Sequence, residues 1–219
     1  MNLRIFDTAD DLVRSAARTL RQRIASGARS IALSGGSTPK PLYELLGEDP
    51  PAEPITWVVV DERYVPIDDP QSNAGMIEST LFAKGKPEGH RFLRFRTELG
   101  DPVRTAAEFE REWKSIGLVH LDIVLLGMGD DGHTASLFPG TDVLQVEDRI
   151  AAAVHVDRLD SWRVTLTRPV LREAGLRVVL ATGARKRPVL EAVRAVAELP
   201  IARVTEGLET WWFVDREAT

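Results

Sequence analysis

The sequence has 219 residues, of which 28 are lysine or arginine and 33 are aspartate or glutamate, so the formal net charge is −5. Acidic and basic residues are mixed along the chain, which disfavours nucleic acid and anionic membranes as partners because both require a basic surface. Cysteine is absent, which excludes disulfides, thiolate zinc sites and a cysteine nucleophile and favours a reducing, cytoplasmic location.

Neither a secretion signal nor a membrane span is predicted. Residues 1–7 lack the basic and apolar regions of a signal peptide, and no apolar run approaches the length of a membrane-spanning helix. The longest polar loops, residues 47–54 and 84–91, are too short for convincing linkers, and no internal repeat is present. We therefore expect one domain over residues 1–219.

Short apolar runs alternate with helical patterns along the chain. The runs predict buried strands at Leu3–Phe6, Ser30–Leu33, Thr56–Val60, Asp122–Leu126 and Arg177–Ala181. Apolar residues at helical spacing predict helices over Ala9–Ala25, Asp101–Trp113 and Arg185–Ala197. Near the end, Arg163–Thr167 and Trp211–Val214 also have strand character. The alternation predicts an α/β fold with a mainly parallel sheet and helices on both faces.

Ligands of open α/β sheets bind beyond the carboxyl ends of the strands, so the segments that follow the apolar runs are the candidate site. The first reads Ser34, Gly35, Gly36, Ser37, Thr38 and Pro39. Pro39 suits the first turn of a helix with Thr38 as its N-cap. Paired glycines, hydroxyl groups and free helix N–H groups could bind a phosphate. A plain tight turn explains the segment equally well, and the Gly-Lys-Ser/Thr end of a Walker A loop is missing.

A charged triplet, Asp61-Glu-Arg, follows the next buried run. Asp61 could position a sugar hydroxyl or a water, and the planar guanidinium of Arg63 could hold a phosphate. A local salt-bridged turn is the alternative, and it is the commoner explanation of an isolated acidic segment. Downstream, residues 71–75 (Gln-Ser-Asn-Ala-Gly) resemble the cap of another helix.

The richest segment is Gly127-Met-Gly-Asp-Asp-Gly-His. Its glycines match a dinucleotide fingerprint formally, but Asp130 and Asp131 in the turn would repel a pyrophosphate. Asp131 and His133 instead suit a general base, because a carboxylate can orient a histidine and stabilise its protonated form. A surface turn and, less favoured, a divalent cation held by Asp130 and Asp131 are the alternatives. The chain lacks a Gly-x-Ser-x-Gly elbow, so a covalent serine mechanism is not predicted.

Taken together and in this order, these segments resemble the 6-phosphogluconolactonase family. The resemblance is carried by Ser34-Gly-Gly-Ser-Thr-Pro, Asp61-Glu-Arg-Tyr-Val with Ser72-Asn73, Gly127-Met-Gly-Asp-Asp-Gly-His-Thr-Ala-Ser-Leu-Phe-Pro, Arg163-Val-Thr-Leu-Thr and Thr182-Gly-Ala-Arg-Lys. It implies a Rossmann-like domain similar to glucosamine-6-phosphate deaminase. It also implies hydrolysis of 6-phospho-D-glucono-1,5-lactone to 6-phospho-D-gluconate in the oxidative pentose phosphate pathway. We expect neither a metal nor a cofactor.

Carried over by motif, His133 is the expected base with Asp131 beside it, and Asp61 is a third candidate catalytic residue. Many relatives have a Lys/Pro-rich stretch before the Arg-x-Thr-Leu-Thr block, whereas this chain reads Asp157-Arg-Leu-Asp-Ser-Trp. Arg158 is therefore the candidate for the phosphate contact from that stretch. The expected substrate- and phosphate-binding residues are Ser34, Gly35, Gly36, Ser37, Thr38, Arg63, Arg158 and Lys186.

Two other functions compete with this one. The deaminase pattern is similar to Gly-x-Asp-Gly-His-x-Ala-Phe-Asn-Glu-Pro, but its glutamate aligns with Phe138, and its Asp-Glu-Tyr is Asp61-Glu-Arg here. A non-catalytic sugar-phosphate sensor would not need Asp131 and His133, and strand signals that begin at Leu3 leave no room for a DNA-binding segment. Both comparisons favour the lactonase, acting on a small sugar-phosphate lactone as a monomer or weak homodimer, without nucleic acid or membrane partners.

Overall fold

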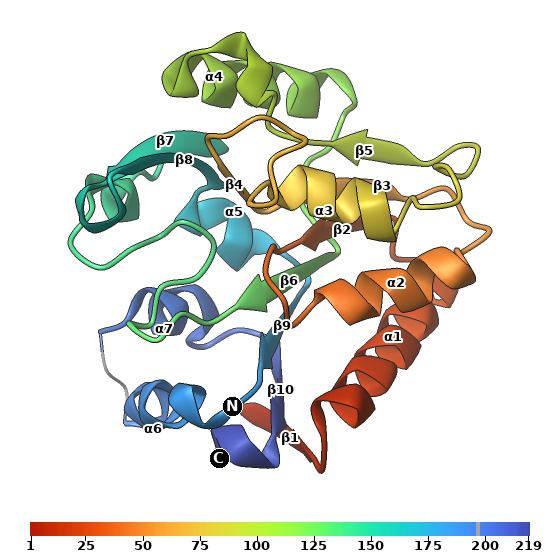
Figure 1. Cartoon of the computed structure of the whole chain (residues 1–219), viewed down its shortest axis with the longest axis vertical. Helices are drawn as coiled ribbons and strands as arrows, with labels where there is room; N and C mark the ends of the chain where they lie inside the picture. Colours follow the sequence, from red (N-terminus) through yellow and green to blue (C-terminus); the bar gives the residue numbers. More distant parts are fainter. Residues whose placement is uncertain (196–197) are drawn as a thin grey trace.

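The computed structural model describes residues 1–195 and 198–219. Its main sheet has seven strands, and every neighbouring pair in it is parallel (Figure 1). In spatial order the strands are β1 (Asn2–Phe6), β10 (Thr210–Asp215), β9 (Leu176–Ala181), β6 (Ile123–Gly127), β2 (Ser30–Leu33), β3 (Thr56–Val59) and β5 (Arg91–Leu93).

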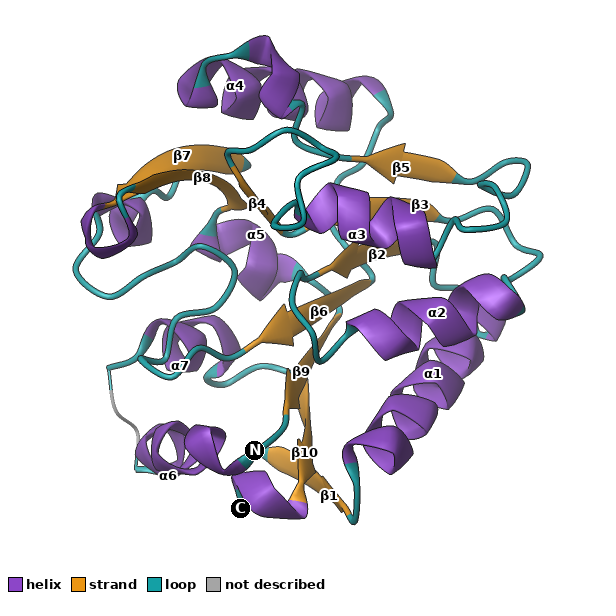
Figure 2. Cartoon of the chain, viewed as in Figure 1, coloured by secondary structure: helices purple, strands orange, loops and turns teal. Residues whose placement is uncertain are grey.

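Helices cover both faces of this sheet, as the alternating pattern predicts. In Figure 2, α1 (Ala9–Ala25) and α2 (Lys40–Glu48) lie on one side, while α5 (Arg168–Glu173), α6 (Arg187–Arg194) and α7 (Pro200–Thr205) lie on the other. The interior strands β2 and β9 are mostly apolar and are buried at every position, because both of their faces are covered. The predicted fold class and its five main strands are confirmed, each end to within one residue.

The first helix has the predicted bounds because its sequence specifies both the cap and the buried stripe. The hydroxyl of Thr8 accepts the backbone N–H of Asp11 at 3.1 Å, and Leu12, Leu20 and Ile24 are buried on one face. The predicted helix from Asp101 is α4 (Pro102–Ser115), with the Asp101 side chain as its N-cap.

Two expectations about helix starts need correction. The helix predicted over Arg185–Ala197 begins with a 3-10 turn, Ala184–Lys186, and its α-helical part ends at Arg194; Val196 and Ala197 lie outside the described residues. Thr38 is not an N-cap: α2 begins at Lys40 with Pro39 in the cap position. Because the helix starts one residue later, the Thr38 hydroxyl is free to meet Thr182 Oγ1 at 3.1 Å.

A second, antiparallel sheet was not predicted. It consists of β4 (Asp61–Arg63), β8 (Ser161–Leu166) and β7 (Ala151–Val156), and α4 packs against it. Val60 joins the two sheets, because its N–H donates to Leu33 O of β2 at 3.0 Å and its carbonyl accepts the N–H of Leu166 in β8 at 2.8 Å. The chain therefore passes from one sheet to the other within one residue.

The expected cap at residues 71–75 is confirmed. The Ser72 hydroxyl accepts the N–H of Gly75 at 3.0 Å at the start of α3 (Asn73–Thr80). Membrane crossing has no structural support in the parts of the chain that are described, where every helix is too short or too polar for it.

A buried histidine makes stability sensitive to acid. Trp57 in β3 donates its indole N–H to His90 Nδ1 at 3.0 Å, and both side chains are buried. Burial lowers the pKa of His90, and the neighbouring carbonyl groups of Pro51 and Glu53 offset this only in part. In the unfolded chain the His90 imidazole therefore binds a proton below a pH of about 6.5, whereas in the folded chain it does so only at a lower pH.

We expect the free energy of unfolding to fall as the pH drops below about 6.5, because the unfolded chain then binds a proton more readily than the folded chain does. His90→Gln keeps an acceptor for the Trp57 N–H but has no ring to protonate, so its loss of stability between about pH 7 and 5 should be smaller. Urea unfolding at the two pH values measures this difference. His120→Gln, at an exposed histidine, is the control, and an equal pH slope in His90→Gln and wild type would contradict the prediction.

Candidate active site

The carboxyl ends of β2 and β6 lie side by side at the point where the order of the strands along the chain reverses. From β2 the chain continues to its neighbour β3, whereas from β6 it returns to β9 on the opposite side. Open α/β sheets hold their ligands at such a switch point. A cavity of about 500 Å³ lies here. Every residue predicted from the sequence to belong to the site lines this cavity except Asp131, namely Ser34, Gly35, Gly36, Ser37, Thr38, Asp61, Arg63, His133, Arg158 and Lys186.

Asp131 lies directly behind His133. Its Oδ1 is 2.5 Å from His133 Nδ1 and also accepts the His133 backbone N–H at 3.1 Å. Burial raises the pKa of Asp131, but the hydrogen bonds from His133 and the charges of His133 and Arg158 outweigh it and leave the pKa below its ordinary value. With Nδ1–H donated to the carboxylate, Nε2 is left as the basic atom of the ring.

The turn that presents this pair depends on two glycines. Gly132 has a φ of 77°, which favours glycine, and its N–H donates to Gly129 O at 3.0 Å. A Cβ on Gly129 would lie 2.0 Å from His133 Nδ1 and 2.7 Å from Asp131 Oδ1. Only a glycine at position 129 leaves room for the hydrogen bond between His133 and Asp131.

An aromatic ring fixes the plane of the imidazole. The Phe138 ring stacks on His133 with the centroids 4.2 Å apart. Arg158 approaches from the turn Asp157–Leu159 between β7 and β8, with its guanidinium carbon 5.0 Å from the Phe138 centroid. Its Nη2 donates to Asp131 Oδ2. The sequence predicts Arg158 in the site, but not its ion pair with the carboxylate.

The two acidic residues of β4 face different surroundings. Asp61 borders the cavity, and its Oδ2 accepts the Ser136 hydroxyl at 2.6 Å. Glu62 points to the start of α3, where it accepts the N–H groups of Asn73 and Ala74, both at 2.7 Å. Burial raises the pKa of Glu62, although these hydrogen bonds act against it. The triplet is therefore a strand at the edge of the antiparallel sheet with a helix-capping glutamate, and not the salt-bridged turn that was the alternative.

Several basic side chains line the same cavity, among them Arg63 and Lys186. Lys186 Nζ lies 2.5 Å from Asp130 Oδ1, and this contact holds the pKa of Asp130 below its usual range. Arg63 Nη1 donates to the carbonyl of Gln71 at 2.6 Å. The cavity thus carries several positive charges, which suits an anionic ligand.

Sequence reasoning missed Arg163 as a site residue. It lines the cavity from β8 and is only 9% exposed. Burial and the neighbouring Arg63 lower the pKa of Arg163. The available signal was the one charged residue in a strand that is otherwise uncharged, because a buried cation needs an anionic or polar partner. Other lining residues that sequence reasoning left out of the site are Asn73, Thr182 and Arg185.

The glycine-rich loop after β2 offers unused donors. Ser34 is 4% exposed, and its hydroxyl has no hydrogen-bond partner among the described residues. Gly36 has a φ of 104°, and a Cβ on Gly35 would lie 1.8 Å from Asn73 Oδ1. The backbone of this loop therefore comes closer to its surroundings than side chains would permit.

The two acidic residues of the turn, Asp130 and Asp131, are already paired with basic side chains. Asp130 contacts Lys186, and Asp131 contacts both His133 and Arg158. Within residues 1–195 and 198–219, no group of three or more His, Asp or Glu side chains is placed to hold a metal ion. The two carboxylates that a divalent cation would need, those of Asp130 and Asp131, are thus already paired with other side chains.

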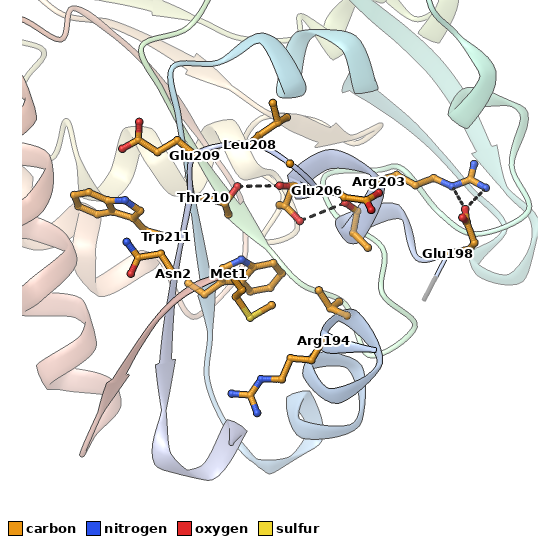
Figure 3. Close-up of a pocket in the computed structure, with 15 residues that line it drawn as sticks. Met1, Asn2, Arg194, Glu198, Arg203, Glu206, Leu208, Glu209, Thr210 and Trp211 are labelled. Carbon is orange, nitrogen blue, oxygen red and sulfur yellow. Dashed lines mark hydrogen bonds and ion pairs between the residues drawn. The ribbon is translucent and has the colours of Figure 1, made fainter. Parts of the chain in front are cut away.

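A larger cavity, of about 620 Å³, lies at the opposite ends of the strands (Figure 3). It is lined from the starts of β1 and β10 and from α6 and α7, and it holds none of the predicted site residues. Three of its charged side chains are in ion pairs: Arg203 lies 2.8 Å from Glu198, and Glu209 lies 3.1 Å from Arg23. It contains no pair of a histidine and a carboxylate, so the smaller cavity is the candidate active site.

Comparisons with known proteins identify relatives of the chain in sequence and in structure. Residues 6–212 match the family described as glucosamine-6-phosphate isomerases/6-phosphogluconolactonase. A 6-phosphogluconolactonase of Nostoc sp. is 36% identical over 88% of this chain and 84% of its own length. The solved 6-phosphogluconolactonase of Trypanosoma brucei has a TM-score of 0.89 at 27% identity, covering 99% of this chain and 97% of its own. A monomeric glucosamine-6-phosphate deaminase shares the fold, with a TM-score of 0.83 at 22% identity over 100% of this chain and 98% of its own.

Proposed function

Because the chain belongs to the glucosamine-6-phosphate isomerase/6-phosphogluconolactonase family, we propose that it is a carboxylic ester hydrolase that opens 6-phospho-D-glucono-1,5-lactone to 6-phospho-D-gluconate. The observation that carries this proposal is His133, paired with Asp131, in a cavity that is also lined by Arg63, Arg163 and Lys186. The reaction belongs to the oxidative pentose phosphate pathway in this proposal. Its mechanism requires no metal.

The chemistry needs one base and one proton donor. His133 Nε2 takes a proton from a water molecule, whose oxygen attacks the lactone carbon C1, and Asp131 stabilises the imidazolium that forms. The carbonyl oxygen gains negative charge and is stabilised by a backbone N–H of a glycine turn. As the bond between C1 and the ring oxygen breaks, the imidazolium returns its proton to the ring oxygen. One water is consumed, and the base is regenerated.

The basic side chains of the cavity orient the substrate in this proposal. A phosphate bound by Arg63, Arg163 and Lys186, with N–H groups of the Ser34–Thr38 loop, would fix the far end of the sugar. Fixing that end places C1 near His133, which converts binding energy into orientation of the reacting atoms. Asp61 would then lie close enough to the sugar to accept a hydrogen bond from one of its hydroxyl groups.

We expect Lys186→Ala to raise KM for the phosphorylated lactone by roughly ten- to a hundredfold, the range of a hydrogen bond to a charged group. Turnover of glucono-1,5-lactone without a phosphate should change little, because that substrate offers Lys186 no anion. Initial rates with both lactones measure the two effects. An equal loss with both lactones would show that Lys186 does not contact the phosphate.

The function itself is tested with freshly made 6-phosphogluconolactone in a coupled assay for 6-phosphogluconate, with spontaneous hydrolysis subtracted. Enzyme-dependent hydrolysis, slower with the unphosphorylated lactone, is expected. Ammonia release from glucosamine 6-phosphate would favour the deaminase instead. Phe138 stands against that outcome, because a phenyl ring packs on His133 where the deaminase pattern has a glutamate. Tight binding without turnover would favour a sensor.

A further inference from the structure

Arg158 already has an anionic partner inside the site. Its guanidinium binds one oxygen of the Asp131 carboxylate, while the other oxygen lies 2.5 Å from His133 Nδ1. The same guanidinium lies over the Phe138 ring, which stacks on the imidazole. One carboxylate therefore serves the proposed base and a cation at the same time.

This sharing weakens what Asp131 does for His133. A carboxylate stabilises an imidazolium through its negative charge, and a guanidinium on its second oxygen offsets part of that charge. Arg158 is not needed to orient the carboxylate, because Asp131 Oδ1 also accepts the His133 backbone N–H at 3.1 Å. In the empty site Arg158 therefore opposes protonation of the base more than it supports its geometry.

The ion pair is also easy to break. The side chains of Arg158 and Asp131 are 54% and 28% exposed, so water competes for both groups. By contrast, Arg163 on the adjoining strand is 9% exposed. Arg158 stands on a three-residue turn at the tip of the β7–β8 hairpin, and it lines the same cavity as the phosphate-binding groups. A phosphate carries more charge than a carboxylate and matches the planar fork of arginine.

We propose that Arg158 exchanges partners when substrate binds, leaving Asp131 for the phosphate of the lactone, so that Asp131 then acts on His133 alone. This inference rests on the proposed lactonase function. Arg158 is in this view a positioning residue that couples the phosphate at one end of the substrate to the strength of the base at the other. An unphosphorylated lactone would bind without releasing Arg158 and would be hydrolysed slowly for that reason.

The test separates the phosphate from the reacting ring. Wild type and Arg158→Gln are compared on glucono-1,5-lactone, alone and with inorganic phosphite added as a separate dianion. We expect phosphite to accelerate the wild type. Without phosphite, Arg158→Gln should hydrolyse this lactone about two- to fivefold faster than wild type, the effect of removing one exposed ion pair. Phosphite should accelerate the variant less, and KM of the variant for 6-phosphogluconolactone should rise.

Two controls and the opposite outcomes complete the experiment. Arg158→Lys keeps a positive charge and should restore most of the phosphite effect, while Arg14→Gln, at an exposed arginine of α1, should match wild type throughout.

A higher KM with unchanged hydrolysis of the unphosphorylated lactone would mean that Arg158 only binds phosphate. An equal fall in kcat with both lactones would mean that it only holds Asp131 in place. Either result overturns the exchange, whereas a wild type inactive on 6-phosphogluconolactone would overturn the function itself.

Discussion

His133→Ala is expected to lower kcat/KM for 6-phosphogluconolactone by about a hundred- to ten-thousand-fold, the usual contribution of a general base. The ring is only partly buried, with 30% of its side chain exposed, so its removal should leave the fold in place. The loss should therefore appear in kcat while Tm stays close to the wild-type value. Initial rates with the spontaneous reaction subtracted, together with a thermal melt, measure both quantities.

The matched control is His120→Ala, because His120 is exposed and lies outside the cavity. It should keep the wild-type rate. Asp131→Asn adds a second check, since it keeps the shape of the carboxylate but removes the charge that stabilises the imidazolium. If His133→Ala retained wild-type kcat/KM, another group would have to be the base.

Gly129→Ala is expected to reduce kcat by about a hundredfold, although position 129 need not touch the substrate, because a displacement of about 1 Å at a reacting group can have that effect. The added methyl group would lie 2.0 Å from His133 Nδ1, so the imidazole must move away from Asp131. Gly129 is not among the glycines with a positive φ, so alanine can adopt its backbone conformation. Kinetics and Tm measured side by side distinguish a displaced ring from an unfolded chain.

Gly127→Ala, at the end of β6, serves as the control for stability, since a Cβ there meets no atom within 4 Å. It should keep the Tm of the wild type. Equal activity in Gly129→Ala and wild type would show that the close contact between the two side chains is not required for catalysis.

Much of the main sheet can be predicted from the sequence because its strands are buried on both faces. Runs such as Thr56–Val60 are then apolar at nearly every position, and no partner strand has to be known. The candidate site follows from the same pattern, since parallel strands bring their carboxyl ends to one edge. Ser34, Asp61 and His133 come together there from distant parts of the chain.

The antiparallel sheet could not be predicted in the same way. Asp61-Glu-Arg is too short and too charged to show a strand pattern, and its conformation is set by pairing with β8, where Asp61 faces Thr165. Pairing between such distant segments depends on their packing and not on local preference. For the same reason, the ion pair between Arg158 and Asp131 is visible only once the β7–β8 hairpin is placed.

The junction at Val60 has a consequence for the choice of substrate. Arg63 and Arg163 stand on the antiparallel sheet, and His133 follows a strand of the parallel one, so in the proposed reaction a sugar phosphate would span two frameworks that are joined through the backbone of Val60. The separation of these two frameworks, fixed by main-chain hydrogen bonds, would then limit the length of an acceptable molecule from its anionic group to its reactive carbon. A lactone one carbon shorter or longer would reach the phosphate groups or the imidazole, but not both.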